Sequence, residues 1–231
     1  MSQSYPLISC ICITSNRPKQ LEKAIACFAT QNYPNKELVI SYPKNDLLSK
    51  QVVENIRKDE TLKIMLVERP VDESLGNARN HLIAKCLGDY VCIWDDDDWY
   101  HPSRITYQFN SMQIVGQRYQ ASVLSRIFLY DATTKKVYYS FPYTWDGTIL
   151  CRKEMLLQNQ YANANRAEDT HVITFLSGRK LLYRIEDAPF LYIYIYHGTN
   201  TWDYKHFEHF MNKSELLDQE LTDSILKLID N

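Results

Sequence analysis

Four consecutive aspartates, Asp95 to Asp98, directly follow the apolar run Tyr90–Trp94. The run is rich in β-branched and aromatic residues and has no helical period, which predicts a buried strand, and ligands of open α/β sheets bind at the carboxyl ends of strands. Adjacent carboxylates raise one another's pKa until a cation neutralises them, and oxygen ligands of this kind suit Mg²⁺ or Mn²⁺. We therefore predict a divalent-metal site here; the alternative is a solvated acidic turn that caps the next helix.

The residues before the aspartates alternate between two hydrophobic patterns. Apolar runs without helical spacing predict strands at Leu7–Ile13, Glu37–Ser41, Leu62–Val67 and Tyr90–Trp94. Apolar residues at helical spacing predict helices at Lys19–Thr30, Leu47–Arg57 and Gly76–Cys86. This alternation is typical of an α/β fold and of a nucleotide-binding half over residues 1–100.

The pattern changes after Asp98, where antiparallel strands are expected to enter the sheet. We predict helices at Pro102–Val115, Glu168–Leu176 and Ser214–Ile229, and strands at Val123–Tyr130, Val137–Phe141, Leu181–Ile185 and Phe190–Tyr196. The last strand carries three alternating tyrosines, which either line a sugar cleft or form a half-buried face with hydroxyls in water. The simplest organisation is one domain over residues 1–210 and a helical tail over residues 211–231, packed on the same domain or on a second copy in a homodimer.

Composition excludes several classes of protein. The 26 basic and 28 acidic residues give a net charge of −2, which argues against binding to nucleic acid or to an anionic membrane surface. No apolar run approaches the roughly 20 residues that span a bilayer, and the N-terminus lacks the pattern of a signal peptide. The six cysteines lie in apolar stretches and are expected to be reduced core residues. We expect a cytoplasmic protein.

Five segments together resemble the nucleotide-sugar glycosyltransferases of family 2, which share the GT-A fold. The segments are Leu7–Pro18, Thr30–Ile40, Asn77–Asn80, Asp95–Asp98 and Glu168–Asp169, and their order and spacing match the family's. The resemblance implies a Rossmann-like mixed central sheet flanked by helices, with an antiparallel portion. It also divides the domain into a nucleotide-sugar-binding half, residues 1–100, and an acceptor-binding half, residues 101–210.

The resemblance places the family's metal motif on Asp95 and Asp97. In a strand these two side chains face the same side, so Asp97 is expected to ligate Mn²⁺ or Mg²⁺ directly and Asp95 to reach the metal or the ribose. A bound divalent ion would stabilise the departing nucleoside diphosphate. Asp96 is expected to assist donor binding, although Asp96 and Asp98 are equally suited to orienting the loop or capping a helix.

Further contacts with the sugar donor are expected just after the first strand and at the start of the third helix. These candidates are Thr14, Asn16, Arg17, Asn77 and Arg79. Arg79 lies in the first turn of its helix, where a cation works against the helix dipole unless an anion such as a diphosphate is near. Many family members carry an acidic residue after the second strand that contacts the nucleotide base, and this chain has none there. Asp46 is the expected substitute, with Tyr42 as a stacking partner of the base. The alternative is that both are turn residues. The choice between UDP and GDP donors stays open.

The resemblance makes Asp169 the general base that deprotonates the acceptor hydroxyl, with support from Glu168 and inversion at the anomeric carbon. The alternative for this pair is a helix cap. Trp145 and Asp146 resemble the acceptor-side segment, although Trp145 would serve equally as a core residue. His197 is a candidate third metal ligand, against the alternative of a hydrogen-bonded histidine at a strand end.

The function that follows is an inverting, metal-dependent glycosyltransferase. The expected donor is a nucleoside-diphosphate sugar of UDP or GDP type, and the expected acceptor is a saccharide or lipid-linked saccharide in polysaccharide or glycoconjugate synthesis, at the inner face of a membrane or free in the cytoplasm. The alternatives are a catalytically silent sugar-binding domain, a nucleotidyltransferase, which would need a glycine-rich basic loop, and an aspartate-dependent phosphotransferase.

Overall fold

The computed structural model describes residues 5–56 and 62–230. Two features of the sequence therefore lie outside the described residues: the expected helix end at Arg57 and the start of the chain before Tyr5. Within the described part, the expected α/β alternation is present, and element ends differ from the predictions mostly by one or two residues. No helix of this part is long and apolar enough to cross a membrane.

The larger sheet has seven strands in the order β10-β6-β9-β4-β1-β2-β3. The strands are β1 (Ile8–Ile13), β2 (Lys36–Pro43), β3 (Ile64–Arg69), β4 (Tyr90–Ile93), β6 (Ala121–Leu124), β9 (Leu150–Arg152) and β10 (Leu182–Ile185). All pairs are parallel except those of β9, which runs antiparallel to β4 and β6. The central sheet is therefore mixed, as expected.

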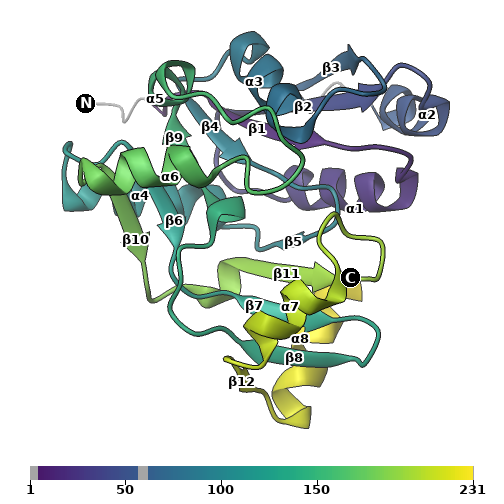
Figure 1. Ribbon diagram of the computed structural model, residues 1–231, viewed down its shortest axis with the longest axis vertical. Helices are drawn as coiled ribbons and strands as arrows, with labels where there is room; N and C mark the ends of the chain where they lie inside the picture. Colours follow the sequence, from purple (N-terminus) through teal and green to yellow (C-terminus); the bar gives the residue numbers. More distant parts are fainter. Residues whose placement is uncertain (1–4, 57–61, 231) are drawn as a thin grey trace.

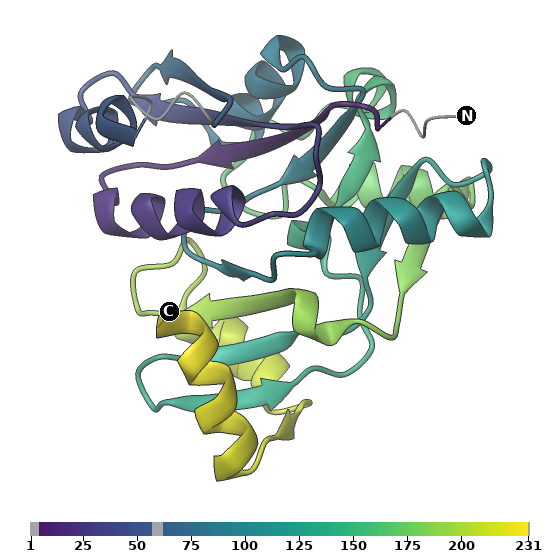
Figure 2. The same ribbon diagram turned by 180° about the vertical axis from the view of Figure 1, so that it is seen from behind.

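Helices cover both faces of this sheet (Figures 1 and 2). The helices are α1 (Pro18–Ala29), α2 (Leu47–Ile56), α3 (Leu75–Lys85), α4 (Arg104–Val115), α5 (Lys153–Gln158) and α6 (Thr170–Gly178). Alternate residues of β1 explain the two layers: Cys10 packs with Phe28 of α1, whereas Ile11 packs with Ile83 of α3. Because both faces are buried, the parallel strands are almost continuously apolar.

A smaller sheet lies below the first one in Figure 1 and has the order β12-β8-β7-β11-β5. Its strands are β5 (Trp99–Tyr100), β7 (Phe128–Asp131), β8 (Lys136–Tyr139), β11 (Tyr192–Tyr196) and β12 (Glu215–Leu216). Two short 3₁₀ helices, η1 (Asp146–Thr148) and η2 (Pro189–Leu191), and helix α7 (Tyr204–Met211) complete this half. Strands β7 and β8 form a hairpin, where Asp131 accepts hydrogen bonds from Thr133 and Thr134 in the turn.

One predicted strand, Val123–Tyr130, is wrong. It is two strands in different sheets, because the chain leaves the larger sheet after Leu124 and enters the smaller one at Phe128. The crossing is fixed by the Ser125 amide, which donates to the Ile185 carbonyl, and by the Ile127 amide, which donates to the Ser140 hydroxyl. This crossing brings the two sheets together around one cavity.

The predicted C-terminal helix starts later than expected. Residues Glu215–Leu216 pair with β8 as β12, and the helix itself, α8, spans Gln219–Asp230 with Asp218 accepting from the Leu221 amide. Ile225 packs with Val137 and Ile193 of the smaller sheet. The tail thus packs on the chain's own fold, while a homodimer stays a prediction.

Candidate active site

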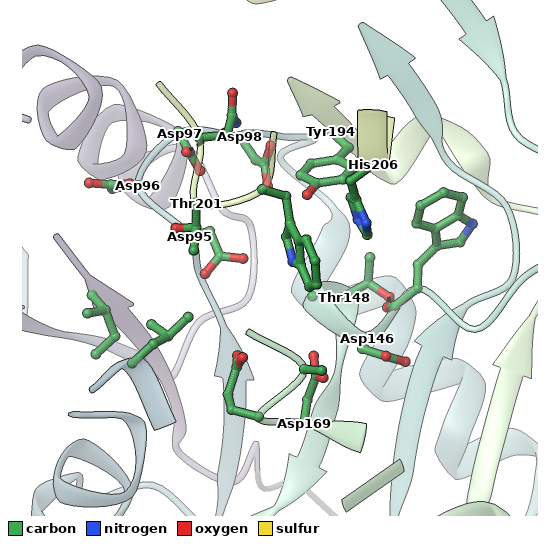
Figure 3. Close-up of a pocket in the computed structure, with 18 of the residues that line it drawn as sticks. Asp95, Asp96, Asp97, Asp98, Asp146, Thr148, Asp169, Tyr194, Thr201 and His206 are labelled. Carbon is green, nitrogen blue, oxygen red and sulfur yellow. Dashed lines mark hydrogen bonds between the residues drawn. The ribbon is translucent and has the colours of Figure 1, made fainter. Parts of the chain in front are cut away.

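The pocket that holds most of the predicted site residues lies where the carboxyl ends of β1 and β4 meet β11 of the smaller sheet. It has a volume of about 370 Å³, and Figure 3 shows its lining. Nine of the predicted site residues line it: Arg17, Arg79, Asp95, Asp96, Asp97, Trp145, Asp146, Glu168 and Asp169. The fold therefore gathers residues from most of the chain into one cavity.

The four aspartates form a turn that we call the acidic tip, Asp95 to Asp98. Strand β4 ends at Ile93, and the Trp94 amide still donates to the Ile11 carbonyl before the chain turns into β5. The prediction that Asp95 and Asp97 share one face of a strand is therefore wrong, since these residues are no longer in the strand. Their side chains instead diverge toward different partners.

Asp96 points back to β1. Thr14 donates its hydroxyl to Asp96 at 2.6 Å, and Arg17 donates to Asp96 at 3.2 Å and to Asp97 at 2.8 Å. Burial and the Asp97 charge raise the pKa of Asp96 to about 7. Thr14 and Arg17 therefore hold the tip from the first strand, and Arg17 lies where it can also meet an anion in the pocket.

Asp97 lies under the loop that follows β11. The imidazole Nε2 of His197 is 3.1 Å from the Asp97 carboxyl, and the Asn200 amide nitrogen is 3.4 Å from it. Arg17 also donates to the Thr199 carbonyl of the same loop. His197 is thus next to the predicted metal ligand, although metal ligation by His197 stays a prediction.

Asp98 is buried and orients the smaller sheet. It accepts hydrogen bonds from the Tyr192 hydroxyl and from the Ile195 amide at 2.8 Å, so it does not cap α4, which begins only at Arg104. Tyr192 and Tyr194 line the pocket, so the expectation that the tyrosine hydroxyls lie in water is wrong for Tyr192. The strand Phe190–Tyr196 is shorter than predicted because its first residues belong to η2.

Asp95 faces α3 and the loop before α6. Arg79 donates to Asp95 at 3.2 Å and forms a short ion pair with Glu168. Burial lowers the pKa of Arg79, but Asp95 and Glu168 outweigh this and raise it above its usual value. Arg79 is therefore paired with protein carboxylates, while its predicted contact with a diphosphate stays a prediction.

Glu168 and Asp169 lie just before α6, which starts at Thr170 and not at Glu168 as predicted. Ala167 has a φ of 53°, and this left-handed residue turns the chain into the pocket. Asp169 occupies the N-cap position, yet its side chain makes no capping hydrogen bond. The cap interpretation therefore fails for the Asp169 carboxyl, which lines the pocket across from the acidic tip (Figure 3).

Asp146 on η1 lies near this carboxyl pair. Burial, followed by the charges of Asp169 and Glu168, raises the pKa of Asp146 to about 7. Its Oδ1 atom is buried and has no hydrogen-bond partner within the described residues. Asp146 thus holds a proton more readily than an ordinary carboxyl, and the residue lines the pocket.

An aromatic wall forms the side of the pocket next to these carboxyls. Trp145 is 5% exposed, and its ring centroid lies 5.0 Å from that of Phe210 and 5.4 Å from that of Tyr143. Trp202 stacks on His206 with centroids 4.2 Å apart. Tyr143, His206 and Phe210 were not predicted from the sequence. His206 and Phe210 belong to α7, an amphipathic helix whose pattern shows only that one face is buried.

The remaining donor-side candidates, Thr14, Asn16, Asp46 and Asn77, are not among the residues that line the pocket. Asp46 is buried, and its two oxygens accept from the backbone amides of Asn16 at 2.5 Å and Ser49 at 3.0 Å. It caps α2 and fixes the loop after β1, which does not support its predicted contact with a base. Tyr42 donates to Glu68, away from the pocket. The Asn77 amide donates to the N-cap residue Ser74, which places Asn77 in the first turn of α3, as expected.

The carboxyls of the tip fit a divalent ion that is shared with a ligand. No group of three or more His, Cys, Asp or Glu side chains in residues 5–56 and 62–230 is arranged to hold a metal alone. The side chains of Asp95 and Asp97 are 28% and 12% exposed and line the pocket. Mg²⁺-type sites commonly use one or two carboxylates together with substrate phosphates, which matches this arrangement.

Solved structures with similar folds are glycosyltransferases. TarS of S. aureus in complex with UDP matches with a TM-score of 0.66 and 16% identity, covering 82% of this chain and 60% of that one. The mannosyltransferase PcManGT from Pyrobaculum calidifontis, in complex with GDP-Man and Mn²⁺, matches with a TM-score of 0.67 and 15% identity, covering 86% and 59%. The fold is therefore of GT-A type.

Sequence comparison gives the family. A GalNAc(5)-diNAcBac-PP-undecaprenol beta-1,3-glucosyltransferase of Campylobacter jejuni is 34% identical over 94 residues, which cover 40% of this chain and 30% of that protein. The chain thus matches less than a third of this curated relative. The family model described as glycosyl transferase family 2 matches residues 9–188, more than half of the chain. The chain belongs to glycosyl transferase family 2.

Proposed function

We propose that this chain transfers a sugar from a nucleoside-diphosphate sugar to a hydroxyl acceptor, with a divalent metal ion and with inversion at the anomeric carbon. The observation that carries the proposal is the pairing of two acidic groups in one pocket. The acidic tip lies on one side, and Asp169 with Asp146 lies on another (Figure 3). One side suits a metal-bound diphosphate and the other suits proton removal from an acceptor.

The donor side consists of Asp95, Asp97 and Arg17. Asp97 and Asp95 would hold the ion, which when bound neutralises charge on the departing diphosphate. Arg17 adds a guanidinium next to both the tip and the loop after β11. Mn²⁺ and Mg²⁺ both suit these oxygen ligands, and the titles of the solved relatives name UDP, UDP-GlcNAc and GDP-Man. Both nucleotide types therefore enter the donor panel below.

The acceptor side is organised around Asp169. Its carboxyl is free of capping bonds, so it can accept a proton from an acceptor hydroxyl. Arg79 ties Glu168 to Asp95, which fixes the loop that carries Asp169 relative to the acidic tip. A base on the opposite side from the leaving group gives direct displacement and hence inversion.

The aromatic wall suits a saccharide acceptor, because a ring face packs well on the apolar face of a sugar. The Campylobacter jejuni relative is named for a lipid-linked saccharide, undecaprenol diphosphate with attached sugars. We propose an acceptor of this kind, free or lipid-linked, in polysaccharide or glycoconjugate synthesis. The first hundred residues then form the donor half and residues 101–210 the acceptor half.

The test is release of nucleoside diphosphate from a panel of UDP- and GDP-sugars with Mn²⁺ or Mg²⁺. The wild-type chain is expected to release it with one metal and one donor, and Asp97→Asn is expected to lose this activity. Arg118→Ala, which removes an exposed arginine far from the pocket residues, is the matched control. Release of pyrophosphate would instead show a nucleotidyltransferase, and nucleotide binding without turnover would show a silent binding domain.

A further inference from the structure

A second groove adjoins the active-site pocket on the side of α6 and β10. It has a volume of about 540 Å³, and Tyr143, Asp146 and Thr170 line both cavities. Its other walls come from the segment after β8, from α6 and from the end of β10, including Thr144, Arg184 and Glu186. The two cavities therefore share a boundary, at which Asp146 and the residue after Asp169 lie.

We propose that this groove binds the second sugar of the acceptor, so that the part of the acceptor that enters the site is an uncharged saccharide of at least two units. The inference rests on the proposed function and adds a substrate class to it. It would make the protein an enzyme that extends an existing glycan chain and not one that places the first sugar.

The position of the groove follows from the direction of transfer. The acidic tip suits the diphosphate, and Asp169 lies across the pocket from it (Figure 3). The acceptor hydroxyl must lie next to Asp169, and the rest of the acceptor must leave on the side away from the diphosphate. Thr170 follows Asp169 directly and lines both cavities, so the groove begins at the point where the acceptor leaves the pocket.

The groove has the chemistry of a carbohydrate site. Its hydroxyl groups come from Ser125, Thr144, Thr170 and Thr174, and the Tyr143 side chain at its entrance is 45% exposed. The lining contains one guanidinium, Arg184, and two carboxyls, Asp146 and Glu186, so the groove offers no excess of positive charge for a phosphate. Hydroxyls, an aromatic ring and balanced charges favour a neutral polyhydroxyl ligand.

Two groups in or beside the groove are prepared for a ligand. Arg184 donates to the Thr144 hydroxyl at 3.0 Å and to the Ser177 hydroxyl at 3.3 Å, which fixes the guanidinium, and it takes part in no ion pair within residues 5–56 and 62–230. Asp146 lines both cavities at their boundary. A sugar hydroxyl at this boundary would lie next to Asp146.

The experiment measures binding of the chain, saturated with Mn²⁺ and UDP or GDP, to an array of immobilised mono- and disaccharides. Each disaccharide is compared with the monosaccharide that has the same non-reducing terminal sugar. Arg184→Ala and Glu186→Gln change two exposed residues of the groove, and Arg118→Ala is the control for loss of an exposed arginine. Nucleotide binding is measured by calorimetry on the same samples.

For at least one terminal sugar, the wild-type chain and Arg118→Ala should bind the disaccharide about tenfold more tightly than the monosaccharide, the gain expected from one or two hydrogen bonds to a charged group. Arg184→Ala and Glu186→Gln should reduce this ratio and leave nucleotide binding unchanged. The inference is overturned if no disaccharide is preferred, or if the preference survives in both groove variants. If no disaccharide is preferred but nucleotide binding is intact, only the proposed role of the groove is overturned. If the wild-type chain shows no Mn²⁺-dependent nucleotide binding, the proposed function is overturned as well.

Discussion

Replacing Arg79 tests whether the buried ion-pair network holds the two sides of the active site together. Arg79 is 5% exposed and donates to both Asp95 and Glu168. In Arg79→Met the two carboxyls lose their partner, and the Glu168 side chain, which is 6% exposed, cannot be hydrated without a local rearrangement. Removing one member of a buried ion pair costs about 3 to 5 kcal/mol of the free energy of unfolding.

For a chain of this size the loss corresponds to a fall in Tm of about 10 °C, since each kcal/mol shifts Tm by about 2 to 4 °C. The loss should shrink at acid pH. Burial raises the pKa of Glu168 while Arg79 lowers it, so without Arg79 this carboxyl protonates at higher pH and its buried charge disappears as the pH falls. Urea denaturation of the wild type and Arg79→Met at about pH 5 and about pH 8 measures both effects.

A second substitution separates charge from packing. Glu168→Gln in the Arg79→Met background removes the unpaired carboxylate, so the double variant should be more stable at about pH 8 than Arg79→Met alone. The exposed substitution Arg118→Ala should leave stability within about 0.5 kcal/mol of the wild type. The reasoning is refuted if Arg79→Met costs less than about 1 kcal/mol at about pH 8, or if Glu168→Gln gives no recovery at that pH.

Three further changes address the site. Asp169→Asn should keep Mn²⁺-dependent nucleotide binding and lower sugar transfer by about 10²- to 10⁴-fold, the usual contribution of a general base; unchanged turnover would remove Asp169 from the mechanism. His197→Ala should weaken Mn²⁺ binding in the nucleotide complex by about tenfold if His197 ligates or orients the metal site, and unaltered affinity in calorimetry would dismiss that role. Asp146→Asn should change the pH dependence of stability. Because the pKa of Asp146 is raised from 3.8 to about 7, the folded chain keeps a proton that the unfolded chain loses, and stability falls as the pH rises through this range. In denaturant titrations the variant should lack about 4 kcal/mol of that fall, and identical pH profiles would contradict the assignment.

The fold could be predicted from the sequence because its signals are local. Buried parallel strands are continuous apolar runs, and helices such as α1 show a single apolar face, so the elements up to Asp98 were predicted within one or two residues. The break between β6 and β7 was missed, since Ser125–Ile127 lies within a pattern that reads as one strand and only the pairing partners show that the chain changes sheets.

The site could be predicted only in part. The residue types at the tip and at Glu168–Asp169 indicated their chemistry, yet their partners depend on the tertiary fold. The ion pair of Arg79 with Glu168 was missed because it joins residues 89 positions apart. The two hydrogen bonds of Asp46 were missed because one of them comes from the loop of Asn16, 30 positions away. Phe210 and His206 reach the pocket from a helix whose sequence shows only burial on one face.

The most direct test of the central claim is calorimetry of Mn²⁺ and UDP or GDP with the wild-type chain and with Asp97→Asn. The claim is that the acidic tip binds a divalent ion together with a nucleoside diphosphate. One of the nucleotides should bind the wild type clearly more tightly with Mn²⁺ than with a chelator, and Asp97→Asn should abolish this difference. Nucleotide binding that is the same with Mn²⁺ and with the chelator, or no binding of either nucleotide under any condition, would contradict the claim.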